Sequence, residues 1–297
     1  MSLLDKVSSG VIKRPYYILI HGIPGIGKST FASEFPDPLF LCSEKGTGHL
    51  DVKRLEFTVF QEFIDTLTDL RKDSRQYKTV VIDTIDHMEP MIHDLVAKDN
   101  DKKSIDEIGY NKGFDFAIDY WMKLINLCEA LRDEKGMNIV FLAHTYVKTF
   151  NDPQQTVGYD RYQVKLHHKA AGLFVDRVEA VFFANYETFV KKDDGGKARA
   201  LGEGVRLMFT EHRPAFVAKN RHDLPFKMPF SYEDFNRLAS SPKSTDPVEL
   251  KKNIQELLKE VKSDDVKKTV ATRVTEAGDN IKLLVAIENR LKAIVAG

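Results

Sequence analysis

The sequence predicts an α/β protein built on a mostly parallel β-sheet flanked by helices, with a small helical appendage at its C-terminal end. Short apolar runs rich in β-branched residues alternate with amphipathic helical stretches over residues 16–184, which is typical of a parallel sheet. Several of these runs end in polar residues, as expected where parallel strands end at a ligand-binding edge. A polar linker at 240–247 separates an expected domain at 1–240 from a helical region at 248–297.

Composition limits the classes of protein that the chain can represent. Its 297 residues, 42% of them hydrophobic, suffice for one large domain and a small appendage. The formal net charge is zero, so any contact with nucleic acid must use local basic patches. Cys42 and Cys128 lack the spacing of metal ligands and are expected to be buried thiols in a reducing compartment. Neither a signal peptide nor an apolar run of bilayer length is evident, so a cytoplasmic location without membrane contact is expected.

Residues 22–29 read G-x-x-x-x-G-K-S, which is the P-loop pattern. An apolar β-prone run at 16–20 precedes it and a helix start at 29–35 follows it, and this order disfavours a glycine-rich turn without a ligand. Glycines let successive N–H groups face a polyphosphate, and the following helix N-terminus favours anions. Lys28 is expected to contact the β- and γ-phosphates of ATP. The residues expected to bind the nucleotide are Gly22, Ile23, Pro24, Gly25, Ile26, Gly27, Lys28, Ser29 and Thr30.

The remaining elements are expected to alternate in the same way. Further strands are expected at 39–42, 78–83, 138–143, 177–184 and 205–209. Helices are expected at 59–70, 88–98, 113–135, 165–174 and 231–238, the last with a Ser-x-x-Asp cap. Polar loops are expected at 99–109 and 148–162, and a hairpin turn at 193–196, with 205–209 as its partner or neighbour. About three amphipathic helices are expected within 248–295.

Two side chains are expected to hold Mg²⁺ beside the nucleotide. Asp83 ends a buried apolar run, in the place that the acid of the Walker B motif takes. Ser29 follows the P-loop lysine and offers a hydroxyl ligand. ATP and Mg²⁺ are therefore the expected cofactors. Asp86 lies slightly further along the chain, where N-capping of the next helix is its expected use and a second acid of the site is the alternative.

Glu44 and His144 follow two other strands and are the groups expected near the γ-phosphate. Hydrolysis needs a polar group that orients the attacking water. Thr84, and not a glutamate, follows Asp83 directly, so Glu44 at the end of the neighbouring strand is the expected water-activating residue. The alternative for Glu44 is an ordinary surface acid. His144 is expected either to sense the γ-phosphate or to be a structural histidine.

These features together resemble the RecA superfamily. The features are Glu44 after the second strand, Asp83-Thr84 at the Walker B position, His144 after the strand at 138–143, and the segment Ala218-Lys219-Asn220-Arg221. More closely, the chain resembles phage-encoded, RecA-core-like ATP-binding proteins that act in single-strand annealing and recombination. The resemblance covers about residues 13–238, and 248–297 is assigned by composition alone. Where that family has a glutamate followed by two glycines, this chain has Glu44-Lys45-Gly46.

The resemblance implies a homo-oligomer, a ring or a filament, with ATP at subunit interfaces. Lys219 and Arg221 match the position from which a neighbouring subunit's basic residues reach the γ-phosphate, and their alternative is a solvated basic edge. For a phage-encoded protein, the expected location is the host cytoplasm.

Binding of single-stranded DNA is a further implication of the resemblance. The loops that bind it in RecA-like proteins correspond here to 148–162 and 165–169. Aromatic and basic residues alternate there, which suits backbone contact combined with base stacking, although a solvated surface explains them equally well. The residues concerned are Tyr159, Arg161, Tyr162, Lys165 and Lys169. The C-terminal helices are expected to close over the nucleotide, to mediate assembly or to recruit a partner such as a single-strand-binding protein.

Other functions of a P-loop protein remain open on the sequence. An assembly scaffold that binds ATP without strand activity is one alternative. A small-molecule kinase is disfavoured because the charged segment 99–110 contains no arginine for a lid. A GTP switch is disfavoured because no Asn-Lys-x-Asp motif for base recognition occurs at a suitable place.

Overall fold

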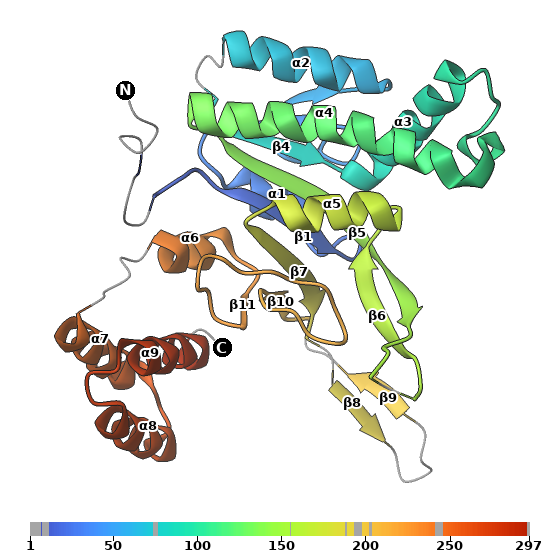
Figure 1. The fold of residues 1–297 in the computed structure, drawn as a ribbon. Coiled ribbons are helices and arrows are strands. Elements are labelled where there is room, and N and C mark those ends of the chain that lie inside the picture. Colours follow the sequence, from blue (N-terminus) through green and yellow to red (C-terminus); the bar gives the residue numbers. More distant parts are fainter. Residues whose placement is uncertain are drawn as a thin grey trace.

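The computed structural model describes residues 7, 12–73, 77–154, 156–187, 189–192, 198–201, 204–240 and 246–295. Its strands are β1 Tyr17–Gly22, β2 Pro38–Cys42, β3 Lys53–Glu56, β4 Thr79–Asp83, β5 Asn138–Phe150, β6 Tyr159–Val164, β7 Ala180–Tyr186, β8 Phe189–Lys192, β9 Ala198–Leu201, β10 Arg206–Phe209 and β11 Lys227–Pro229. The main sheet has the order β11-β10-β7-β1-β5-β4-β2-β3, with β6 also paired to β5 (Figure 1). The six strands β3, β2, β4, β5, β1 and β7, which are consecutive in the sheet, pair in parallel. Strands β6, β10 and β11 pair antiparallel to their neighbours. The predicted α/β class is therefore confirmed.

Helices cover both faces of this sheet, which explains why its middle strands are apolar along their length. The helices of the larger part are α1 Lys28–Ser33, α2 Phe60–Lys72, α3 Ile85–Asp99, α4 Lys112–Lys135, α5 His168–Arg177 and α6 Tyr232–Ser240. Side chains of α2 to α5 pack with Tyr17 and Leu19 of β1, whereas those of α1 and α6 pack with Ile18 and Ile20. Successive residues of a strand point to opposite faces, so β1 contributes to both hydrophobic clusters. The single tryptophan, Trp121, belongs to α4 and is fully buried.

The segment 148–162 is not the polar loop that the sequence predicts. Strand β5 continues beyond His144 to Phe150, and β6 returns antiparallel to it, with Thr145 opposite Val164 and Phe150 opposite Tyr159. The aromatic and β-branched residues of this segment favour an extended backbone, and its polar residues concealed that preference. The result is a β-hairpin that extends the sheet at the carboxyl end of β5 (Figure 1).

Three other expectations about loops and hairpins have different outcomes. Strand β9 pairs with β8, so the segment at 205–209 is not the partner of β8; as β10 it pairs with β7 and β11. The turn expected at 193–196 lies outside the described residues. The loop expected at 99–109 contains a short 3₁₀ turn, Ile105–Glu107, and a second such turn, Gly109–Asn111, follows it.

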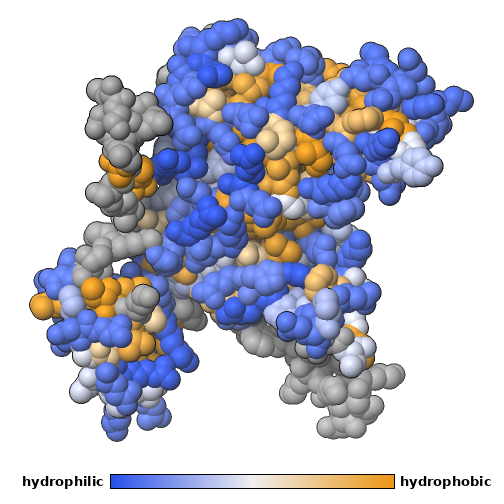
Figure 2. Space-filling model, viewed as in Figure 1, coloured by the Kyte–Doolittle hydropathy of each residue, from blue (hydrophilic) through white to orange (hydrophobic). Residues whose placement is uncertain are grey.

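Three helices follow the linker, as the sequence predicts: α7 Pro247–Glu260, α8 Asp264–Ala277 and α9 Ile281–Val295. Asp246 caps α7 by accepting a hydrogen bond from the Val248 amide, and Ser263 caps α8 through the Val266 amide. Among the described residues, these helices share a hydrophobic cluster of their own. Apolar side chains also reach their surface, as Figure 2 shows, and the exposed ones include Val248 and Leu283. None of the helices in the described ranges is long and apolar enough to span a bilayer.

Candidate nucleotide-binding site

The loop between β1 and α1 has the backbone that a phosphate-binding loop requires. Gly25 and Gly27 have φ angles of 76° and 102°, and L side chains rarely adopt such angles. Gly27 stands directly before the first turn of α1, whose free N–H groups face the loop. Gly22 is required for another reason, since a Cβ built there would lie 2.4 Å from the Ala184 carbonyl oxygen on β7. Local backbone geometry therefore requires glycine at 25 and 27, and packing against β7 requires it at 22.

Lys28 lies buried beneath the loop with its ammonium group held by the loop itself. Its Nζ donates to the carbonyl oxygens of Gly22 and Ile23 at 3.1 and 3.2 Å. Burial lowers the pKa of Lys28, whereas Asp83, Asp86 and Glu44 act to raise it. The lysine therefore sits among acids located at the carboxyl ends of β2 and β4, and a polyphosphate in the loop would bring it a stronger anionic partner.

Ser29 and Asp83 are brought together as the sequence predicts. The Ser29 hydroxyl donates to Oδ2 of Asp83 at 2.7 Å, and the Asp83 side chain is buried. Burial raises the pKa of this carboxyl group, and the Ser29 hydrogen bond opposes that effect. A hydroxyl and a carboxylate at this separation are oxygen donors of the kind that Mg²⁺ prefers, so the residues present fit the expected ion.

His144 is fixed by an acid whose use the sequence does not predict. The Asp86 carboxylate accepts one hydrogen bond from the His144 backbone amide and another from its Nδ1, each at 2.9 Å. Burial acts to raise the pKa of Asp86, but the hydrogen bonds from His144 outweigh it and the pKa is lowered. Helix α3 has Thr84 at its N-cap without a side-chain cap bond, so the expectation that Asp86 caps this helix is wrong.

Glu44 lies in the same cluster and is contacted by a residue that sequence reasoning missed. His87, in the first turn of α3, places its Nδ1 3.0 Å from Oε2 of Glu44 and 3.0 Å from Oγ1 of Thr84. The His87 and His144 rings meet edge to face with their centroids 5.5 Å apart. The only hint in the sequence is the position of His87 about one helical turn after the strand that ends in Asp83.

Lys219 and Arg221 occupy different environments. Lys219 donates to the carbonyl oxygens of Val175, Asp176 and Val178 at 2.7 to 2.9 Å, so it caps the C-terminal end of α5 within its own chain. Arg221 is exposed and makes no hydrogen bond or ion pair with any residue in the described ranges. Of the two, Arg221 is the one whose cationic group is available to another molecule, because the Lys219 ammonium is already bonded to three carbonyl oxygens.

The residues considered for DNA contact are also partly engaged. Lys169 forms an ion pair with Asp115, and the Tyr162 ring packs against Phe183. Arg161 on β6 stacks over the Phe150 ring, with its guanidinium carbon 4.8 Å from the ring centroid.

Lys165 connects this region to the nucleotide site. Its Nζ lies 3.8 Å from Oδ2 of Asp86, the oxygen that also accepts a hydrogen bond from His144. The β5–β6 hairpin thus adjoins the cluster around His144.

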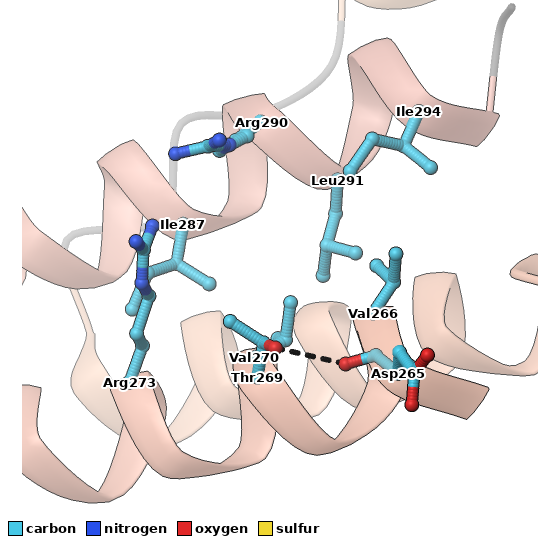
Figure 3. Close-up of a pocket in the computed structure, with 9 residues that line it drawn as sticks. All are labelled: Asp265, Val266, Thr269, Val270, Arg273, Ile287, Arg290, Leu291 and Ile294. Carbon is cyan, nitrogen blue, oxygen red and sulfur yellow. Dashed lines mark hydrogen bonds between the residues drawn. The ribbon is translucent and has the colours of Figure 1, made fainter. Parts of the chain in front are cut away.

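A separate cavity of about 210 Å³ lies between α8 and α9 in the C-terminal helices. Val270, Leu291 and Ile294 contribute its apolar wall, and Figure 3 shows Arg273 and Arg290 projecting from the two helices beside it. Neither arginine has an ion-pair or hydrogen-bond partner within the part of the chain that the structure describes.

Fold and site together define a P-loop NTPase: a phosphate-binding loop at the carboxyl ends of the parallel strands, with the acid at the end of β4 against its serine. Comparison with known families agrees. A family model described as an AAA domain matches residues 14–222, so the chain belongs to this AAA domain family.

Individual proteins give a weaker likeness. A solved structure titled "Crystal structure of the RadB recombinase" matches with a TM-score of 0.37 and 10% sequence identity, covering 67% of this chain and 83% of that chain. No curated protein matches the chain.

Proposed function

We propose that this protein is a Mg²⁺-dependent ATPase that acts on single-stranded DNA in phage recombination, annealing or replication, in the host cytoplasm. The observation that carries the ATPase assignment is the 2.7 Å contact between Ser29 and Asp83 beside the buried Lys28. It joins the P-loop to the acid at the end of β4, and the carboxyl ends of the strands also carry Glu44 and His144.

Each residue of the site has a distinct task in this proposal. The loop amides and Lys28 bind the phosphates of ATP, while Ser29 and Asp83 hold Mg²⁺. When bound, the ion neutralises charge on the phosphate oxygens. Glu44 orients the attacking water and accepts its proton, and His87 positions the Glu44 carboxylate. His144, held by Asp86 through Nδ1, presents its other ring nitrogen to the γ-phosphate.

Assembly of several copies completes the site in this proposal. A basic residue supplied by a neighbouring subunit stabilises charge that develops on the transferring phosphoryl group. Arg221 suits that task because it is exposed and has no partner among the described residues. Lys219, which is bonded to three carbonyl oxygens of its own chain, supports the segment that carries Arg221.

The β5–β6 hairpin is the proposed contact with single-stranded DNA. It carries the exposed Lys148 and the half-buried Tyr159 and Arg161, and its first strand is the part of β5 that follows His144. Lys165 lies near Asp86, so a phosphate that attracts Lys165 changes the charge around the carboxylate that holds His144. DNA binding and ATP hydrolysis are coupled through this short connection.

The C-terminal helices are the proposed site for a partner protein. The cavity beside Arg273 and Arg290 has an apolar wall and two cations without described partners, which suits an acidic segment that carries a large apolar side chain. A single-strand-binding protein is the partner to test first. Replacing Arg273 by Glu should abolish its binding in an anisotropy titration, whereas Lys123→Glu on α4 should not, and equal binding by both variants would disprove the proposal.

The test of the DNA-linked ATPase measures ATP hydrolysis with and without single-stranded DNA, alongside the molecular mass with and without ATP. Stimulation by DNA and a rise in mass with ATP are expected. Arg161→Glu should lose the stimulation and reduce the slope of DNA affinity against salt by about 0.7 for each phosphate contact removed. The charge-matched variant Lys123→Glu should behave like the wild type. Hydrolysis that ignores DNA, together with no DNA binding at low salt, refutes the recombination role and favours an assembly scaffold.

A further inference from the structure

Three potential metal ligands meet beside the nucleotide site but are separate from the Ser29–Asp83 pair. Glu44 follows β2, His87 lies in the first turn of α3, and His144 lies on β5. One ligating atom of each lies within 4.8 Å of those of the other two. The geometry points to a binding site for one transition-metal ion of the zinc type, formed by these three side chains.

The separations fit such an ion after small side-chain movements. With metal–ligand distances of about 2.1 Å, two ligand atoms of a tetrahedral zinc site lie about 3.4 Å apart. Nδ1 of His87 and Oε2 of Glu44 are already 3.0 Å apart. The most widely separated pair of ligand atoms is at most 4.8 Å apart, so these two atoms must move closer to bind one ion. Rotation of the partly exposed Glu44 or His87 side chain can bring them closer.

His144 is oriented as metal-binding histidines usually are. In most such sites the second ring nitrogen donates to a carboxylate, which fixes the tautomer and the plane of the ring. Asp86 provides this contact through the 2.9 Å bond to Nδ1, which leaves Nε2 as the ligand atom. The second carboxylate oxygen of Asp86 accepts from the His144 backbone amide, so both oxygens of this carboxylate are bonded to His144.

The donor set selects a different ion from the Mg²⁺ pair. Two imidazoles and one carboxylate favour Zn²⁺, Co²⁺ or Ni²⁺, whereas Mg²⁺ prefers oxygen ligands alone. The His87 and Glu44 side chains are 41% and 31% exposed, so an ion can enter and can keep a water as its fourth ligand. The consequence for catalysis rests on the proposed function: an ion here occupies both the Glu44 carboxylate that activates water and the His144 nitrogen that faces the γ-phosphate. Zinc therefore inhibits hydrolysis, while the loop amides and Lys28 still hold ATP.

Metal binding is tested on the full chain without nucleotide, so its outcome does not depend on whether the protein hydrolyses ATP. Zn²⁺ is titrated by calorimetry in excess Mg²⁺, and Co²⁺ is followed by the visible absorption of tetrahedral cobalt. One ion per chain is expected. Asp86→Asn should weaken binding about 10- to 100-fold, as loss of a carboxylate behind a ligand histidine does. His87→Ala, at a partly exposed position, should weaken it at least as much and serves if the buried variant fails to fold.

The chain has nine histidines, so matched controls are needed. His49→Ala removes an exposed histidine from the loop that carries Glu44, and should leave both titrations unchanged. If the wild type binds no zinc, or if His87→Ala binds it as tightly as His49→Ala, the inference is overturned. Zinc inhibition of ATP hydrolysis that persists in His87→Ala overturns the proposed link to catalysis, while the calorimetric result on the site stands.

Discussion

Replacing Gly22 by Ala should damage the sheet and the nucleotide site together. The added Cβ would lie 2.4 Å from the Ala184 carbonyl oxygen and 3.2 Å from its carbonyl carbon, and both belong to the backbone of β7. Two central parallel strands must therefore separate, and overpacking of this kind costs about 1 to 3 kcal/mol. For a domain of this size, a loss of 2 kcal/mol lowers the melting temperature by about 4 to 8 °C.

Tryptophan fluorescence reports unfolding of the larger domain alone, because Trp121 is the single tryptophan and is buried in that domain. Its fluorescence should show Gly22→Ala unfolding at lower temperature and lower denaturant concentration than the wild type. Gly172→Ala is the matched control: this glycine lies in α5 with nothing within 4 Å of a built Cβ, so the change should stabilise by about 1 kcal/mol. If Gly22→Ala is as stable as the wild type, the close packing of β1 against β7 is refuted.

Three further predictions concern charge and assembly. Burial raises the pKa of Glu89 to about 7 from 4.5, so the cost of burying its charged carboxylate is absent below pH 4.5 and complete above pH 7. Glu89→Gln should therefore unfold at a higher denaturant concentration than the wild type at pH 8, but not at pH 4.5. Midpoints that are the same for the variant and the wild type at pH 8 would contradict this. Asp83→Asn should remove the gain in ATP affinity that Mg²⁺ gives the wild type, measured by calorimetry with and without the ion; an unchanged gain excludes Asp83 as its ligand. Arg221→Ala should slow hydrolysis about a thousandfold. Mixing it with Glu44→Gln subunits should restore activity, because a site with an intact Glu44 can then receive an intact Arg221 from the neighbouring subunit. If the mixture is as inactive as either variant alone, Arg221 does not act between subunits.

Local sequence was sufficient for the P-loop and for Asp83. Short-range rules determine both: glycines at positive φ before a helix, and an acid after a run of buried β-branched residues. The contact between Ser29 and Asp83 then follows from the order of elements, since the parallel strands β1, β5 and β4 all have their carboxyl ends on the same side of the sheet.

The surroundings of His144 could not be predicted in the same way. Asp86 reaches it across 58 residues of sequence, and the contact depends on how α3 leaves β4 relative to β5. A side chain in the first turn of a helix has several possible partners, and capping is the commonest, so sequence reasoning chose that use for Asp86. His87 was missed for the same reason.

The two basic residues near 220 show a different limit. The pattern places Lys219 and Arg221 on an extended segment, where alternate residues face the same way. The structure shows that Lys219 reaches the end of α5 and binds three carbonyl oxygens there, while Arg221 stays exposed. Whether a lysine on a sheet edge points to solvent or to a helix end depends on where that helix stops, and the spacing of the two residues carries no information about it.

The central claim is that the loop at 22–30 binds ATP and that Glu44 activates water for its hydrolysis. The most direct test is a single-turnover measurement of ATP hydrolysis by Glu44→Gln, with ATP affinity measured on the same sample. The amide keeps the shape of the side chain but cannot accept the proton, so affinity close to that of the wild type and a rate lower by about 10² to 10⁴ are predicted. An unchanged rate would show that another group activates the water, and undetectable ATP binding by the wild type itself would contradict the account as a whole.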